Sequence, residues 1–246
     1  MPRSRPLITV AVFDLDDTLY DCRRQRVLAA HRHACQKLLQ AGLRRRANRR
    51  FTLQHLLKIR RRLFRQQRNL DTLDLRLCFH LGLRGREARR LARRGRQAYF
   101  SYPVRHLRLF PETRPTLRRL HQSGVQIFIL TAGLLRIQRA KTRLLGLDRS
   151  PYVRKIFYTR LTRGRGKKQY LRRVLQVEPN PRRVLVVGDR ADSEIRAANQ
   201  LGMWTVRRRG GEFAGYEPQR RDERPHFTIR RLSQLFRLPL VFAKPV

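Results

Sequence analysis

Carboxylates are scarce in this 246-residue chain, and seven of the 17 lie in two short windows. One window holds Asp14, Asp16, Asp17 and Asp21, and the other holds Asp189, Asp192 and Glu194. Each follows an apolar run, Ile8–Phe13 in the first case and Val184–Gly188 in the second. Such runs are typical of strands buried in a parallel sheet. Carboxyl groups crowded at the ends of buried strands repel one another and lose hydration, so a cation is needed to offset them.

Magnesium is the cation that this pattern favours. Mg²⁺ prefers oxygen ligands and usually takes one or two carboxylates together with water and substrate phosphate. In open α/β sheets, ligands bind at the carboxyl ends of adjacent strands, so we expect the two windows to converge on one ion. The alternative is an Asp-rich turn whose side chains cap the backbone. For Asp192 and Ser193, which precede an expected helix, capping is the favoured interpretation.

The elements that must position these acids alternate between strand and helix. After Phe110 the apolar pattern predicts a helix with Thr113 as its N-cap, followed by further helices after Gly133, from Lys167 and from Ser193. The expected strands are 125–130, 155–158, 184–187 and 204–207, with a possible edge strand at 227–229 and a short helix at 232–238. Strands alternating with helices predict a doubly wound parallel α/β sheet.

The alternation is interrupted between residues 22 and 106. Helical periodicity covers about 22–41, 52–67, 71–81 and 85–99, and this block contains no strand pattern. We therefore predict an α/β core formed by residues 1–21 and 107–246, with an inserted all-helical domain at 22–106.

The composition is ordinary except for its charge. An apolar fraction of 41% supports a real core, and three cysteines without a C-x-x-C spacing suggest buried thiols in a reducing compartment. No apolar stretch is long enough for a membrane span, so we expect a cytoplasmic protein. The 59 Lys and Arg residues give a net charge of +42, which attracts anionic substrates and, non-specifically, nucleic acid. The arginine runs lack interleaved aromatic residues, which weakens the case for a dedicated base-reading surface.

Four motifs in order resemble the haloacid dehalogenase-like (HAD) hydrolase superfamily. They are D-L-D-D-T at residues 14–18, Thr131 after the second expected strand, Lys167 opening a later helix, and G-D-x-x-x-x-E from Gly188 to Glu194. The match spans nearly the whole chain, and the helical insertion resembles the helical cap of that family.

The resemblance implies a role for each acid. Asp14 would attack phosphorus to form an aspartyl-phosphate, and Asp16 would act as general acid and then general base. Phosphatases of the family keep this second aspartate, whereas dehalogenases lack it. Asp14, the backbone carbonyl of Asp16 and Asp189 would bind Mg²⁺ directly, with Glu194, or less favourably Asp192, bound through water.

Thr131 and a lysine complete the implied site. Thr131 would hold the phosphate at a helix start, with plain helix capping as an equally good alternative. Ala132 stands where the family usually has asparagine, which removes one contact. Lys167 or Lys168 would steady Asp14 and the phosphoryl group, and we favour Lys167 because it directly follows Gly166. The proline that often follows this lysine in the family is absent.

These inferences predict a Mg²⁺-dependent phosphatase that hydrolyses a small phosphomonoester through an aspartyl-phosphate. The alternative is a nucleic-acid-binding protein on the same scaffold with weak or lost catalysis. A phosphatase of nucleotides or nucleic-acid ends lies between the two. The sequence identifies neither the substrate nor the oligomeric state.

Overall fold

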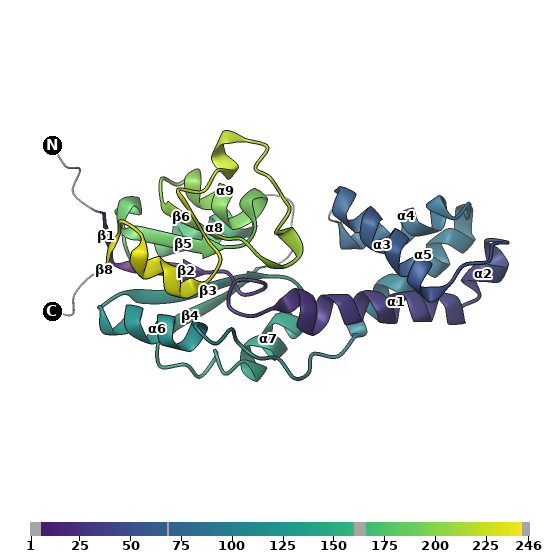
Figure 1. Ribbon diagram of the computed structural model, residues 1–246, viewed down its shortest axis with the longest axis horizontal. Coiled ribbons are helices and arrows are strands. Elements are labelled where there is room, and N and C mark those ends of the chain that lie inside the picture. The colour runs from purple at the N-terminus through teal and green to yellow at the C-terminus, as the bar shows by residue number, and fades with distance from the viewer. Residues whose placement is uncertain (1–5, 68, 160–165, 243–246) are drawn as a thin grey trace. The chain divides into compact units, whose positions relative to one another are not determined.

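The computed structural model describes residues 6–67, 69–159 and 166–242 (Figure 1). The chain divides into two compact units, an α/β unit and a helical unit, Arg24–Pro103, which is inserted into the α/β unit after Arg23. From the sequence we expected the insertion at residues 22–106. None of the helices in the described part of the chain is long and apolar enough to cross a membrane.

The α/β unit is built on a six-stranded sheet in which all neighbours are parallel. Its strand order is β4 (Val153–Thr159), β3 (Gln126–Ala132), β2 (Val10–Phe13), β5 (Val184–Gly188), β6 (Trp204–Arg208) and β7 (Phe227–Ile229). The two faces are covered by α6 (Thr113–Gln122) with α7 (Leu135–Leu144), and by α8 (Gly166–Val174) with α9 (Arg196–Asn199) (Figure 1). This arrangement confirms the predicted doubly wound α/β fold.

Apolar side chains of the strands pack the sheet against the helices that cover it. Val10 and Val12 on β2 share one buried cluster with Val184 and Val186 on β5. Leu171 of α8 belongs to the same cluster. Side chains at every second position of a strand point to the same face, so a single strand supplies both layers. Each buried strand is therefore apolar on both faces, as its sequence predicts.

The first apolar run forms two strands instead of one. Leu7–Ile8 is β1, which pairs in parallel with β8 (Val241–Phe242) in a separate small sheet. The break falls at Thr9, whose backbone N–H donates to the Arg183 carbonyl and whose hydroxyl donates to the Glu178 carboxylate at 2.6 Å. Strand β8 carries too short an apolar signal to be predicted from the sequence.

Three local predictions are corrected by the structure. Strand β3 continues through Thr131 to Ala132, because its pairing with β4 extends to Thr159, so Thr131 does not open a helix. Thr113 is a helical residue, not the N-cap, and its hydroxyl donates to the Leu19 carbonyl at 2.7 Å. The helix expected from Ser193 is a π-helical turn, Ala191–Ile195, followed by the short helix α9.

The remaining segments of the α/β unit are short 3₁₀ turns. They cover Pro181–Arg183, Gly211–Phe213, Arg221–Glu223 and Leu232–Arg237. The last of these replaces the α-helix expected at 232–238.

The helical unit follows a π-helical turn at Arg23–Val27 and contains no strand in its described residues. Its helices are α1 (Leu28–Gln40), α2 (Leu43–Arg46), α3 (Leu53–Gln67), α4 (Leu70–His80) and α5 (Gly85–Ser101). Apolar side chains from these five helices and the connections between them form a core of their own, which includes Leu38, Leu56 and Leu77.

A buried ion pair lies inside the helical unit. Arg60 donates two hydrogen bonds to Asp74, at 2.8 and 2.9 Å, and both side chains are fully buried. His31 contacts the same guanidinium. Gly95 leaves room for the carboxylate, since a Cβ at this position would lie 2.8 Å from Asp74. Arg60 belongs to a run of three arginines, which is a pattern typical of an exposed surface. Its charge can be buried without a large loss of stability only because it is paired with Asp74.

Candidate active site

Asp14 and Asp189 lie at the carboxyl ends of neighbouring strands. Phe13 at the end of β2 is in register with Val187 of β5, and the Asp14 N–H donates to the Val187 carbonyl at 2.8 Å. The connections reverse direction between these two strands, because β2 leads outward to β3 and β4 whereas β5 leads to β6 and β7. Such a switch point is where open α/β sheets bind their ligands.

Three carboxylates converge at this switch point. Oxygen atoms of Asp14, Asp189 and Glu194 lie within 4.8 Å of one another, and all three residues are buried. Burial raises the pKa of Asp14 to about 7 and the pKa of Asp189 well above its usual range, and the neighbouring carboxylates add to both shifts. In both residues burial is the largest cause, because a carboxylate that loses its hydration is harder to ionise, and the charge of Lys167 opposes the shift.

Glu194 is placed by a glycine and a backbone amide. Its Oε1 accepts the Arg190 N–H at 2.7 Å. A Cβ on Gly188 would lie 2.3 Å from the Glu194 side chain, so this carboxylate can pack over the end of β5 only because residue 188 is glycine. Asp192, the alternative acid, instead accepts two hydrogen bonds from the Arg190 guanidinium and is not part of the cluster.

Lys167 enters the cluster from the start of α8. Its Nζ lies 2.5 Å from Asp14 Oδ1 and 2.6 Å from Glu194 Oε2. Burial alone would lower the pKa of Lys167, but the charges of Asp14 and Glu194 outweigh it and raise the pKa. Lys168 bonds to Gln200 on the surface, so the structure brings Lys167 and not Lys168 to the carboxylates.

The donor set fits a divalent cation. Within residues 6–67, 69–159 and 166–242, three buried carboxylates face a single ammonium group, which leaves a net charge of about −2 among these four groups when all are ionised. Two aspartates and a glutamate offer only oxygen ligands, the chemistry that Mg²⁺ selects over softer metals.

The carboxylate of Asp16 is held apart from this cluster by residues of α7 and by Tyr20. Lys141 Nζ lies 2.8 and 2.7 Å from its two oxygens, and the Tyr20 hydroxyl donates to it at 2.7 Å. Gln138 donates a further bond at 3.1 Å. Burial by itself would raise the pKa of Asp16, but Lys141 and these hydrogen bonds lower it to about 2. The resting carboxylate is therefore ionised.

Thr131 shares a donor with Asp16. Its hydroxyl is buried near the end of β3 and accepts a bond from Gln138 Nε2 at 2.6 Å. The same amide also contacts the Ala132 carbonyl. One side chain of α7 thus ties the end of β3 to Asp16.

Asp17 and two buried arginines hold the loops after β2 and β5. Asp17 has a positive φ of 57° and accepts N–H groups from Arg23 and Glu212 at 2.9 and 3.0 Å. Arg208 donates to the Asp17 carbonyl at 2.8 Å, and Arg207 donates to the Asp189 carbonyl at 3.1 Å. Arg207 and Arg208 belong to a run that reads as a phosphate-clamping or solvated surface, yet both are buried and bind backbone oxygens.

A model of the haloacid dehalogenase-like hydrolase family matches residues 8–202, most of the chain. The chain belongs to this family. The resemblance seen in the four motifs is therefore confirmed, and the protein is an enzyme of the HAD-like hydrolase class.

Curated relatives of this HAD-like hydrolase extend over almost its whole length. A glyceraldehyde 3-phosphate phosphatase of Methanopyrus kandleri is 28% identical over 97% of this chain and 100% of its own. The glyceraldehyde 3-phosphate phosphatase of Methanocaldococcus jannaschii is 29% identical, over 93% of this chain and 96% of its own.

Solved structures show the same fold. The YfnB protein of Bacillus subtilis, solved bound to magnesium, aligns with a TM-score of 0.62 at 20% identity and covers 94% of this chain and 97% of its own.

Sequence reasoning missed the roles of several residues that shape the site of this HAD-like hydrolase, among them Tyr20. Gln138 and Lys141 lie three positions apart on α7 and so share one face, and a polar pair at this spacing after Thr131 was the available signal. Arg207 and Arg208 were interpreted as part of a phosphate-clamping or solvated run, and nothing in the sequence indicated that they are buried and bind backbone oxygens.

Proposed function

We propose that this hydrolase is a Mg²⁺-dependent phosphatase that acts on a small phosphomonoester through an aspartyl-phosphate. The observation that carries the proposal is the buried cluster in which Lys167 bridges Asp14 and Glu194 beside Asp189. The relatives named as glyceraldehyde 3-phosphate phosphatases make small sugar phosphates the first substrates to test.

Asp14 is the nucleophile in this proposal. Its oxygen forms a bond to phosphorus while the bond from phosphorus to the ester oxygen breaks, and the product is an aspartyl-phosphate. Lys167 lies against Asp14 and offsets the charge that gathers on the transferring group. Thr131 supplies a hydroxyl at the neighbouring strand end for a phosphoryl oxygen.

Asp16 moves the protons. It donates a proton to the leaving oxygen, then accepts one from the water that attacks the aspartyl-phosphate and releases inorganic phosphate. Because the resting Asp16 is ionised and held by Lys141, it must exchange this partner for a proton before it can act as the acid.

Asp14, Asp189 and the Asp16 carbonyl are the direct ligands that we propose for the metal, with Glu194 bound through water. The ion would neutralise the repulsion between the carboxylate nucleophile and the phosphate anion. We assign the helical unit, which lies between Asp16 and Thr131 in the chain, the role of the cap found in this family.

The test is turnover of a panel of sugar phosphates by the full chain, with Mg²⁺ or with a chelator. Asp14→Asn removes the nucleophile and is expected to lower kcat/KM by about 10⁴-fold or more. The control is Asp71→Asn, which alters an exposed ion pair with Arg96 and should leave turnover unchanged. Mg²⁺-dependent turnover that survives Asp14→Asn would show that the nucleophile is wrongly assigned.

A further inference from the structure

The helical unit contains a pocket whose charged lining is entirely basic. We propose that it binds a small organic anion with an aromatic or other apolar part, such as an aryl or nucleoside phosphate. The pocket has a volume of about 320 Å³ and is lined by residues of the segment before α3, of α3 itself and of the end of α4. This volume suits a single small molecule.

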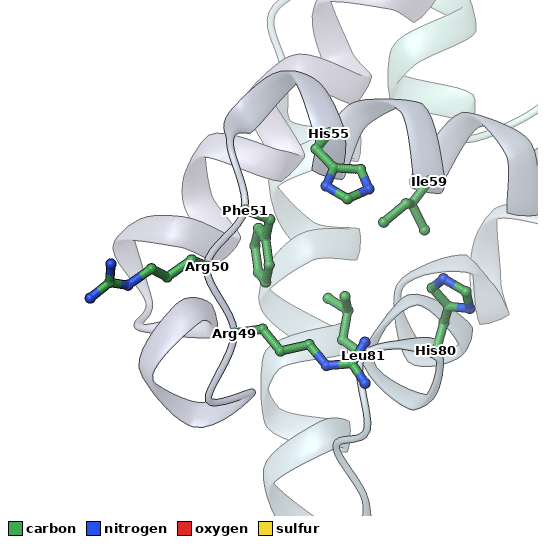
Figure 2. Close-up of a pocket in the computed structure, with 7 residues that line it drawn as sticks. All are labelled: Arg49, Arg50, Phe51, His55, Ile59, His80 and Leu81. Atoms are coloured by element: carbon green, nitrogen blue, oxygen red, sulfur yellow. The ribbon is translucent and has the colours of Figure 1, made fainter.

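Basic and apolar side chains are interspersed around the pocket (Figure 2). Arg49 reaches across the opening toward Leu81 and His80, and His55 stands on the opposite side (Figure 2). Phe51, Ile59 and Leu81 are buried and form the apolar wall. A guanidinium and two imidazoles supply N–H donors for an anionic group, while the Phe51 ring offers a surface for an apolar one.

The positive charge of the pocket is not offset by acids of its own unit. Residues 24–103 contain 23 Lys and Arg residues and three acids, Asp71, Asp74 and Glu87. These acids pair with Arg96, Arg60 and Arg46, respectively, none of which lines the pocket. An anion from solution is therefore the natural counter-charge for Arg49 and its neighbours.

Neighbouring groups strengthen this preference. Arg62 lies against His80, with Nη2 3.4 Å from Nε2, and adds a positive charge near the opening. Arg84 donates to the Phe79 carbonyl at 2.7 Å and so covers a carbonyl at the negative end of α4. The pocket also adjoins the N-terminus of α3, where the helix dipole favours an anion.

Arg50 provides a matched control for Arg49. The two residues are adjacent and both are exposed, so each substitution by alanine removes the same charge from the same segment. In Figure 2 the Arg50 side chain points away from the other lining residues, whereas Arg49 points across the opening. If the overall charge of the protein attracted the anion, both substitutions would weaken binding equally. If the pocket binds it, Arg49→Ala should weaken binding more than Arg50→Ala.

The probe is phenylphosphonate, whose carbon–phosphorus bond a phosphomonoesterase does not cleave. Titration into the full chain is followed by the proton NMR signals of His55 and His80, assigned through His55→Gln and His80→Gln. Both signals should shift and saturate. Arg49→Ala should weaken the apparent Kd by about fivefold or more, and Arg50→Ala by less than about twofold, since only Arg49 faces the anion.

Two comparison ligands test the two halves of the site. Methylphosphonate keeps the anionic group and should bind more weakly, because it leaves the apolar wall uncovered, and neutral benzyl alcohol should produce no saturable shift. Equal losses in the two arginine variants, shifts that never saturate, or equal affinity for the two phosphonates would overturn the proposal. Enzymatic activity is not read, so these outcomes are independent of the phosphatase assignment.

Discussion

At the scale of single residues, the pair formed by Lys141 and Asp16 has a measurable consequence. The Lys141 side chain is buried, whereas 31% of the Asp16 side chain is exposed to solvent, so water screens part of their attraction. Lys141→Met should lower the free energy of unfolding by about 1–2 kcal/mol at neutral pH. It should also slow turnover, because Asp16 loses the partner that positions it.

Chemical denaturation across pH tests this prediction. The pKa of Asp16 is lowered to about 2, so the stabilisation is complete above the ordinary value of 3.8 and disappears as pH falls through about 2. The difference between Lys141→Met and the unaltered protein should shrink in that window. Lys168→Met, at a surface lysine bonded to Gln200, should change stability by less than about 0.5 kcal/mol. Equal effects of the two variants would contradict the assignment.

The acid cluster predicts the opposite pH dependence in metal-free protein. Burial raises the pKa of Asp14 from 3.8 to about 7, so between these values the folded state holds a proton that the unfolded state has lost. The contribution of Asp14 to stability therefore falls as pH rises from about 4 to 7. Asparagine at this position cannot ionise. As pH rises over this range, the free energy of unfolding of Asp14→Asn should therefore increase by about 2–4 kcal/mol relative to that of the unaltered protein.

Denaturation in the presence of a chelator, at intervals from pH 4.5 to 7.5, measures that gain. Mg²⁺ should diminish it, because a bound cation compensates the ionised cluster. Asp71→Asn, at an exposed acid, should give a curve parallel to that of the unaltered protein. Parallel curves for Asp14→Asn as well would mean that the buried cluster does not raise the pKa of Asp14.

Some of the residues that the structure brings together could be predicted from the sequence, for a physical reason. Asp14, Asp189 and Lys167 are polar residues at the ends of apolar runs or at a helix start, where they stand out against their surroundings. Lys141 is hidden because a helix in this chain carries basic residues on most of its surface. Its burial depends on the distant Asp16, a pairing that no local pattern contains.

At the scale of elements, the end of β5 and the turn after it form one packed unit. Gly188→Ala would place a Cβ 2.3 Å from the Glu194 side chain and push its carboxylate away from Lys167 and the Arg190 N–H. We expect kcat/KM to fall by about 10-fold or more and stability to fall by about 1–3 kcal/mol.

Gly215→Ala is the control for this substitution, since a Cβ at residue 215 would meet nothing within 4 Å. Steady-state kinetics and thermal unfolding of the two variants separate crowding at Gly188 from a general cost of replacing glycine. If Gly188→Ala were as active as Gly215→Ala, Glu194 could not be a fixed part of the site.

The order of the elements was predictable because each buried strand is bounded by turn residues and polar groups. The residues at which these elements begin and end were less predictable. Thr131 belongs to β3 because β4 continues beside it, and the π-helical turn at Ala191–Ile195 has no periodicity that distinguishes it from an α-helix. Such boundaries depend on neighbours that are distant in sequence.

At the scale of the whole molecule, the net charge of +42 predicts binding to polyanions that is separate from catalysis. Affinity for a random-sequence RNA should fall by about 10³-fold or more between about 50 and about 200 mM salt, because binding releases counterions. Fluorescence anisotropy measures this slope, and Asp14→Asn should leave it unchanged. Binding that is insensitive to salt would indicate specific recognition instead.

The two backbone segments that connect the helical insertion to the α/β unit are hydrogen-bonded to each other. Tyr20 and Leu109 form an antiparallel bridge, and the Phe110 N–H donates to the Leu19 carbonyl at 3.0 Å, so the outgoing and returning strands of backbone meet at one point of the α/β unit. The insertion also has its own apolar core. Recombination could therefore exchange it for a foreign segment, or shorten it to a simple loop, without cutting the sheet. A lineage with this layout can change what it recognises while inheriting its reactive centre intact.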